Sequence, residues 1–202
     1  MTPAVSAYFR SLADVLLQVE ATDASGAPLS LEQGLTGAVR LVTRQTAAGR
    51  KIIFIGNGGS AAAASHLAVD YWKNGGMRAL AFNDASLLTC ISNDFGYPQV
   101  FEKPIEMFAD AGDVLIAISS SGRSENVHRG VAAARARQCQ VVTLSGFAPD
   151  NPLRRLGDLN FFVPAHTYGP VEIAHLAVCH AIVDYITDEQ ARLRGTSTPS
   201  PS

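Results

Sequence analysis

The stretch IFIGNGGSAAAASHLAVDY, residues 53–71, passes from a short apolar run through a glycine cluster into an alanine-rich segment. The apolar run is typical of a strand buried on both faces, and the segment after it is compatible with a helix. Glycines at the turn let backbone N–H groups approach a ligand, and the N-terminus of a helix favours anions. The stretch therefore predicts a strand–loop–helix unit whose loop can hold an anionic group.

The same alternation continues through the rest of the chain. Apolar runs recur as KIIFI, RALAF, DVLIAI, QVVTL and LNFFV, and helix-compatible segments separate them at about 60–74, 98–109, 124–137 and 170–188. Strands and helices that alternate in this way form a parallel sheet covered by helices on both faces. We therefore expect an α/β core over residues 51–190.

Two further helices are expected before this core, within residues 1–48. The first has apolar residues at helical spacing, namely Val5, Phe9, Leu12, Leu16 and Val19. After a break at DASGAP, Ser30 and Gln33 form a capping-box pattern that begins the second helix, and Gly49 can end it. Residues 1–195 are interpreted as one domain, in which these helices are attached to a single α/β unit.

The composition restricts the class of protein. The chain has 202 residues, of which 47% are hydrophobic, and a net charge of −2 with acidic and basic residues interspersed. No basic stripe indicates a nucleic-acid partner, and no apolar run approaches the ~20 residues of a membrane span. The small, polar, proline-bearing segment 196–202 predicts a disordered tail.

Cysteine usage and the first residues predict a cytoplasmic protein. Cys90, Cys139 and Cys179 each lie alone in an apolar segment, and the chain has no CxxC. An odd number of isolated cysteines is typical of free thiols in a reducing compartment. The opening MTPAVSAYFRSLADV carries an arginine and an aspartate, so we expect no signal peptide.

Two polar loops follow strands of the predicted sheet, at the strand ends where ligands bind in open parallel sheets. The first is GNGGS, residues 56–60, and the second is SSSGRS, residues 119–124. Hydroxyls and backbone N–H groups together can hold a phosphate without a lysine. Neither loop is a Walker loop or a GxGxxG, so a dinucleotide is not favoured. A role as plain turns is the alternative interpretation of either loop alone.

Ionisable residues occur on two of the predicted helices. His66 and Asp70 are four residues apart and therefore share one helical face beyond the glycine loop. Glu172, His175 and His180 lie on the final apolar helix. His175 is interpreted as a hydrogen-bonded core residue, whereas the other four groups are candidates for chemistry.

Four segments in order, GNGGSAAAASHLAVD, SNDFGYPQVF, ISSSGRSENV and VEIAHLAVCHAIVD, resemble the sugar isomerase (SIS) domain. More narrowly, they resemble bacterial phosphoheptose isomerases, which interconvert sedoheptulose 7-phosphate and a glycero-manno-heptose 7-phosphate. The resemblance covers nearly the whole chain. It implies a flavodoxin-like three-layer sandwich with a five-stranded parallel sheet. It also implies a homotetramer, or dimer of dimers, assembled partly through N-terminal helices, with active sites at subunit interfaces.

The resemblance also implies roles for individual residues. The positions that match substrate contacts are Asn57, Gly58, Gly59, Ser60, Asp70, Asn93, Asp94, Ser119, Ser120, Ser121, Ser124 and Glu172. The positions that match ligands of a divalent metal, zinc in the family, are His66, Asp70, Glu172 and His180. Asp70 and His180 match the acid–base pair. For Asn93 and Asp94, a simple turn is the alternative, because both residue types favour turns.

The chain departs from the family at two of these positions. The family usually has glutamate in place of Asp70 and glutamine in place of Glu172. Glu172 and His180 are also about 12 Å apart along an ideal helix axis, so they share an ion only if their side chains converge. Glu172 is therefore the alternative base, with Asp70 on the metal.

The function expected from these residues is aldose–ketose isomerisation through an enediol, with Asp70 as base and His180 as acid. A different phosphorylated sugar is one alternative. Another is a non-catalytic sugar-phosphate sensor, which is expected to lack the histidine of the final helix. His66 and His180 are both present, which favours an enzyme.

Overall fold

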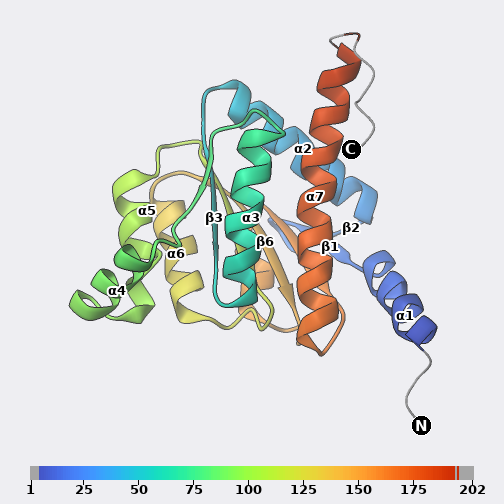
Figure 1. Cartoon of the computed structure of the whole chain (residues 1–202), viewed down its shortest axis with the longest axis horizontal. Coiled ribbons are helices and arrows are strands. Elements are labelled where there is room, and N and C mark those ends of the chain that lie inside the picture. The colour runs from blue at the N-terminus through green and yellow to red at the C-terminus, as the bar shows by residue number, and fades with distance from the viewer. Residues whose placement is uncertain (1–4, 194, 196–202) are drawn as a thin grey trace.

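The computed structural model describes residues 5–193 and 195, so the tail predicted at 196–202 lies outside the described residues. These residues form a three-layer α/β sandwich in which a sheet lies between two layers of helices (Figure 1). The sheet has seven strands in the order β2-β1-β7-β6-β5-β3-β4.

Five neighbouring strands of this sheet are parallel, which confirms the predicted core. They are β3 (Ile52–Gly56), β4 (Ala79–Ala81), β5 (Val114–Ser119), β6 (Gln140–Gly146) and β7 (Leu159–Val163). Each forms where an apolar run was predicted, and every residue of β3 and β5 is buried. A continuous apolar run fits a strand with helices on both faces, because its side chains alternate between two buried layers.

Two short strands at one edge of the sheet were not predicted. β1 (Glu20–Asp23) pairs antiparallel with β7, and β2 (Pro28–Leu29) pairs antiparallel with β1. The predicted break at DASGAP is the turn between them, where Asp23 Oδ1 accepts from the Ser25 and Ala27 N–H groups at 2.8 and 3.0 Å. Strands of four and two residues are too short to show periodicity in the sequence.

Seven helices and two short 3-10 segments complete the described part of the chain. The helices are α1 (Val5–Leu17), α2 (Leu31–Ala47), α3 (Gly59–Lys73), α4 (Ala85–Asp94), α5 (Glu102–Phe108), α6 (Glu125–Ala136) and α7 (Tyr168–Leu193). The 3-10 segments are η1 (Tyr97–Gln99) and η2 (Pro152–Arg155). The capping box is confirmed, since Ser30 Oγ accepts from Gln33 N at 3.1 Å and Gln33 Oε1 accepts from Ser30 N at 2.9 Å.

Three helix predictions are corrected by the structure. α4 was not predicted; it begins after Asp84, whose carboxylate accepts from the Leu87 N–H at 3.0 Å. The helix expected at 98–109 is interrupted, with η1 first and α5 only from Glu102. α1 ends at Leu17, so Val19 lies beyond the helix, where it is buried in the core.

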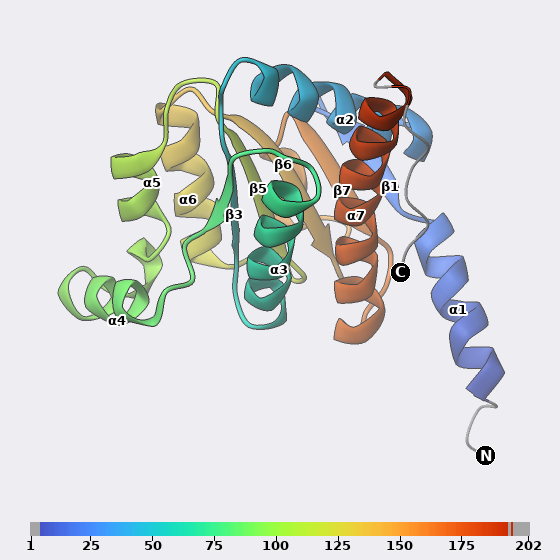
Figure 2. The ribbon, with the colours of Figure 1, turned by 45° about the horizontal axis from the view of Figure 1, so that its top comes forward.

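The helices divide between the two faces of the sheet. Ile52 and Phe54 of β3 pack with α2, α3 and α7, whereas Ile53 and Ile55 pack with the helices of the opposite face, α4 to α6. α3 and α7 lie side by side on the first face, and α1 projects from the body with none of its residues buried (Figure 2). Along the described residues, no helix combines the length and apolar character needed to cross a membrane.

Candidate active site

The two polar loops meet around one cavity of about 230 Å³, here called the serine cavity. It lies where β3 and β5 end, because these two strands are parallel neighbours and their loops leave the sheet at the same edge. The lining residues are Asn57, Gly58, Gly59, Ser60, Ser119, Ser120, Ser121, Ser124, Tyr168 and Glu172. The structure thus brings together ten residues from β3, α3, β5, α6 and α7 or the loops beside them.

The glycine loop begins α3 with an open helix N-terminus. Gly58 precedes the first turn with φ +54° and ψ −121°, a conformation that favours glycine. Having no side chain, it provides no cap for the Gly59 and Ser60 N–H groups, to which an anionic ligand can bind, whereas the Ala61 N–H donates to the Asn57 and Gly58 carbonyl oxygens at 3.2 and 3.0 Å. A Cβ on Gly59 would lie 2.4 Å from Glu172 Oε1, so glycine is required for α7 to place this carboxylate against α3.

The serine loop supplies hydroxyl groups to the other side of the cavity. Ser119 Oγ and Ser124 Oγ lie 3.2 Å apart, and the buried Ser120 Oγ has no hydrogen-bond partner among the described residues. A buried hydroxyl without a partner costs free energy unless a ligand or water satisfies it. Glu172 is the one charged side chain among the lining residues, so neutral donors dominate the cavity.

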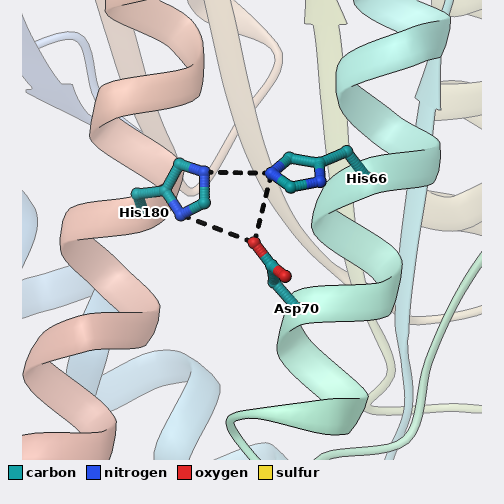
Figure 3. A group of neighbouring side chains, drawn as sticks. All are labelled: His66, Asp70 and His180. Carbon is teal, nitrogen blue, oxygen red and sulfur yellow. Dashed lines mark hydrogen bonds and ion pairs between the residues drawn. The ribbon is translucent and has the colours of Figure 1, made fainter. Parts of the chain in front are cut away.

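Three ionisable side chains form a second group on the same two helices. His66 and Asp70 come from α3 and His180 comes from α7 (Figure 3). His66 Nε2 lies 3.3 Å from His180 Nε2 and 3.2 Å from Asp70 Oδ2, and His180 Nδ1 lies 3.7 Å from Asp70 Oδ2. The side chains of His66, Asp70 and His180 are 53%, 16% and 33% exposed, so the group is accessible from solvent.

This group, called the His–Asp–His cluster below, has the donor set of a metal site. One ligand atom from each residue lies within 4.8 Å of the other two. Two nitrogens and one oxygen suit zinc, whose ligands at about 2.0–2.1 Å from the ion lie about 3.3 Å apart in tetrahedral geometry. Three protein ligands leave a fourth position for water or substrate, which is the arrangement of catalytic zinc sites.

Glu172, the fourth predicted metal ligand, lies outside this cluster. It precedes His180 by about two turns of α7, and its carboxylate lines the serine cavity against Gly59. The structure therefore brings three of the four predicted ligands together. Glu172 is placed with the predicted substrate contacts instead.

His175 is a core residue, as its sequence context indicated. It is buried, and its Nε2 donates to the Ser145 carbonyl oxygen at 3.0 Å. Burial lowers the pKa of His175 to about 4, since a charged imidazole would be removed from water. It is therefore neutral at physiological pH and has no place in the chemistry.

Asn93 and Asp94 do not line the serine cavity. They end α4 in exposed positions, where Asn93 Nδ2 donates to Asp94 Oδ1 at 2.8 Å. The Cys90 thiol donates to Asp94 Oδ2 at 3.6 Å. In this chain Asn93 and Asp94 are exposed to solvent and do not contribute to the cavity between the glycine loop and the serine loop.

Two residues of the site were missed by sequence reasoning. Tyr168 lines the cavity and stacks edge-on against Phe147 with ring centroids 5.0 Å apart. The final helix was expected to begin at Pro170, but it begins at Tyr168, which brings the ring to the cavity. Asn126 is buried beneath the cavity and hydrogen bonded to Asn57. It follows the serine loop in sequence, but nothing in the sequence marks it as buried.

The chain is similar to proteins of known families. The SIS domain family matches residues 7–146. A phosphoheptose isomerase of Thiobacillus denitrificans is 40% identical over 164 residues, which cover 77% of this chain and 81% of that protein. The phosphoheptose isomerase of Syntrophotalea carbinolica is 33% identical over 194 residues, covering 93% and 94% of the two chains.

A solved structure gives the same result. The structure of phosphoheptose isomerase GmhA from Neisseria gonorrhoeae matches with a TM-score of 0.77 and 32% identity, over 90% of this chain and 96% of that one. The fold, the sequence and the order of the site motifs thus agree. The chain belongs to the SIS domain family and, within it, to the phosphoheptose isomerases.

Proposed function

We propose that this protein is an aldose–ketose isomerase that interconverts sedoheptulose 7-phosphate and glycero-manno-heptose 7-phosphate. The observation that carries the proposal is that the serine cavity and the His–Asp–His cluster are built on the same pair of helices, α3 and α7. His66 follows Gly59 by seven residues, which is close to two full turns, so both lie on nearly the same face of α3. A phosphorylated sugar can therefore extend from one to the other.

The serine cavity holds the phosphate. The open N-terminus of α3 and the hydroxyls of the serine loop supply donors to phosphate oxygens. Ser120 Oγ, which is buried without a partner among the described residues, gains one when phosphate binds. Phosphate binding supplies energy remote from the reacting carbons, and this energy positions the other end of the sugar.

The His–Asp–His cluster performs the chemistry at the first two carbons. Isomerisation needs a base that removes a proton from one carbon and returns it to the other, and an acid that protonates the carbonyl oxygen. We assign the base to Asp70 and the acid to His180. Asp70 Oδ2 faces the two histidines, whereas Oδ1 accepts only a long bond of 3.4 Å from Asn74 Nδ2. Glu172 is the second candidate for the base, since it is the carboxylate that lines the serine cavity.

A divalent metal, zinc by its donor set, completes this end of the site. His66, Asp70 and His180 would hold it, one ion in each subunit. When bound, it supplies a Lewis acid that stabilises the negative charge on the sugar oxygens. The protein contributes the orientation of both imidazoles and of the carboxylate, which α3 and α7 fix before substrate arrives.

We further propose that the enzyme is a homotetramer assembled partly through its N-terminal helices, residues 1–48. These helices and the α/β core together form one SIS domain, residues 1–195. Support comes from α1, whose apolar side chains Val5, Phe9 and Leu17 are exposed in the single chain. A second copy of the chain can cover them. We place the enzyme in the cytoplasm, where its three free cysteines stay reduced.

One experiment tests the activity against its alternatives. The purified protein is incubated with sedoheptulose 7-phosphate and a panel of other phosphorylated ketoses, with and without a chelator, and products are measured. Turnover of sedoheptulose 7-phosphate supports the proposal. Faster turnover of another ketose changes the substrate but keeps the chemistry. Binding of sugar phosphates with no turnover of any of them would make the protein a sensor and would overturn the proposal.

A further inference from the structure

The start of α6 contacts both loops of the serine cavity, although its helix was predicted only as a cover for the sheet. Asn126 reaches the glycine loop, and His128, two residues later, reaches the serine loop. Neither residue lines the cavity itself. A single rigid helix thus contacts the two loops that must bind the same phosphate.

The contact with the glycine loop is a reciprocal amide pair. Asn57 Nδ2 donates to Asn126 Oδ1 at 2.9 Å, and Asn126 Nδ2 donates to Asn57 Oδ1 at 2.8 Å. Asn126 is only 3% exposed, and its Oδ1 also accepts from the Val127 N–H at 3.0 Å. Water cannot replace bonds at so buried a position, so the pair fixes the plane of the Asn57 side chain.

Tyr97 adds a third member to this network. Its hydroxyl donates to Asn57 Oδ1 at 2.9 Å from η1. Asn57 Oδ1 thus accepts two bonds within the protein, and one of the two N–H groups of Nδ2 is committed to Asn126. The network therefore holds in place a cavity-lining side chain whose backbone leads directly into Gly58.

The contact with the serine loop is made through the backbone of Gly122. His128 Nε2 donates to the Gly122 carbonyl oxygen at 2.8 Å, and the Leu153 N–H donates to the same oxygen at 3.3 Å. Gly122 has φ +61°, and a Cβ there would lie 2.0 Å from Asn151 Oδ1. The loop is thus held between α6 on one side and the start of η2 on the other.

We propose that Asn126 and His128 are positioning residues that set the spacing between the glycine and serine loops, and hence the affinity for the phosphate of the substrate. The inference rests on the proposed function of the serine cavity. Donors from two loops bind one phosphate well only if their separation is fixed beforehand, because ordering the loops on binding would cost part of the free energy of binding. Asn126 fixes one loop and His128 the other, from the same first turns of α6.

The first test compares two buried asparagines. Asn126→Ala is expected to raise the Kd for inorganic phosphate and the KM for sedoheptulose 7-phosphate by about 10- to 100-fold, with a smaller change in kcat. Asn160→Ala is the matched control: Asn160 is 2% exposed and its Oδ1 accepts from Thr143 Oγ1 at 2.7 Å, but it is the second residue of β7, near the end of the strands opposite to the serine cavity. The control is expected to lose stability without a change in Kd. Calorimetry measures Kd, and thermal unfolding measures stability.

Three further variants keep the proposal testable if Asn126→Ala does not fold. Tyr97→Phe removes only an exposed hydroxyl and is expected to raise the phosphate Kd by a few-fold, the equivalent of one neutral hydrogen bond. His128→Leu is expected to raise it further. His128→Gln, whose amide can still donate to Gly122, is expected to restore the affinity, which a merely structural role for the ring would not predict.

The outcomes separate this inference from the proposed function. Folded Asn126→Ala, His128→Leu and Tyr97→Phe variants that bind phosphate as the unaltered protein does would overturn the positioning role. If the unaltered protein binds sedoheptulose 7-phosphate but does not convert it, and the variants still lose affinity, the positioning role stands and the isomerase assignment fails. Failure of the unaltered protein to bind either probe contradicts both.

Discussion

At the scale of single residues, the two carboxylates Asp70 and Glu172 occupy different parts of the site. Asp70 belongs to the His–Asp–His cluster, with Oδ2 at 3.2 Å from His66 Nε2. Glu172 lies in the serine cavity against Gly59. The aspartate side chain is short, so it can approach both imidazoles only because α3 and α7 hold His66 and His180 close together. Asp70 Oδ2 lies 3.2 Å from His66 Nε2 and 3.7 Å from His180 Nδ1.

Replacing Asp70 with asparagine tests the assignment of the base. Asp70→Asn is expected to lower kcat by roughly 100- to 10,000-fold, the usual contribution of a positioned base, while the Kd for inorganic phosphate stays unchanged. Asp184→Asn is the control, since Asp184 is an exposed aspartate one turn beyond His180 on α7 and makes the same change in charge. Steady-state kinetics measures both. Undiminished turnover by Asp70→Asn would remove Asp70 from the mechanism.

Replacing Glu172 with glutamine removes the one charged side chain among the residues that line the serine cavity. The carboxylate repels a phosphate in the serine cavity, so Glu172→Gln is expected to tighten the binding of inorganic phosphate by roughly 3- to 10-fold, with turnover retained. Calorimetry at two ionic strengths measures the gain, which falls at high salt because charge repulsion is screened. A loss of turnover of a hundredfold or more would instead assign the base to Glu172.

At the scale of elements, α7 contributes to the cavity, the cluster and the core. Glu172 and His180 are partly exposed toward α3, whereas His175 is buried against β6. One helix can do this because the side chains three and eight residues after Glu172, those of His175 and His180, point in different directions around the axis. The histidines of α7 thus differ in function because of their place on the helix.

The pH dependence of stability is expected to depend on His175. Its pKa falls to about 4 in the folded protein, against about 6.5 when unfolded, so the unfolded chain binds more protons between these values. His175 therefore does not lower the free energy of unfolding above about pH 6.5, but lowers it by up to about 3 kcal/mol as the pH falls to about 4. Urea unfolding at several pH values measures it. His175→Gln is expected to reduce this dependence, and His166→Gln, at an exposed position, to leave it unchanged.

The His–Asp–His cluster depends on α3 and α7 together, since each helix supplies only part of it. Dialysis against a chelator is expected to abolish turnover, and added zinc to restore it. His66→Ala and His180→Ala are each expected to lower the bound zinc, measured by elemental analysis, by 10-fold or more. A chelated protein that keeps full turnover, or variants that retain one zinc per chain, would contradict the site.

At the scale of the whole molecule, α1 is the helix that packs least against the core of a single chain. None of its residues is buried, and Phe9 is 62% exposed. Most stability of a helix in a protein comes from packing of its apolar face, so a helix of 13 residues needs a surface to pack against. We expect that surface to belong to another copy of the chain.

Replacing Phe9 with serine tests this assembly. Burial of a phenylalanine contributes about 1.5–3 kcal/mol, so Phe9→Ser is expected to weaken subunit association by roughly ten- to a hundredfold. Light scattering after gel filtration measures the mass of the complex. Arg10→Ser, on the same helix, is the control and is expected to leave the mass unchanged. An unaltered protein that is monomeric at micromolar concentration would contradict the assembly.

The sequence by itself determined the α/β class, the five parallel strands and the two ligand loops. Continuous apolar runs and glycine clusters are local signals, and parallel strands necessarily bring the loops that follow them to one edge. The sequence also placed His66 and Asp70 on one face of a helix, because a spacing of four residues is a property of the helix alone.

Only the tertiary structure decided the rest. The cluster needs His180 from a helix that begins about a hundred residues after α3, and the separation of Glu172 from it depends on how the two helices pack. Burial of Asn126 against Asn57, the contribution of Tyr168 and the pairing of β1 with β7 likewise follow from long-range packing. Such contacts leave no periodic trace in the sequence, because each depends on residues that are distant along the chain and adjacent only after folding.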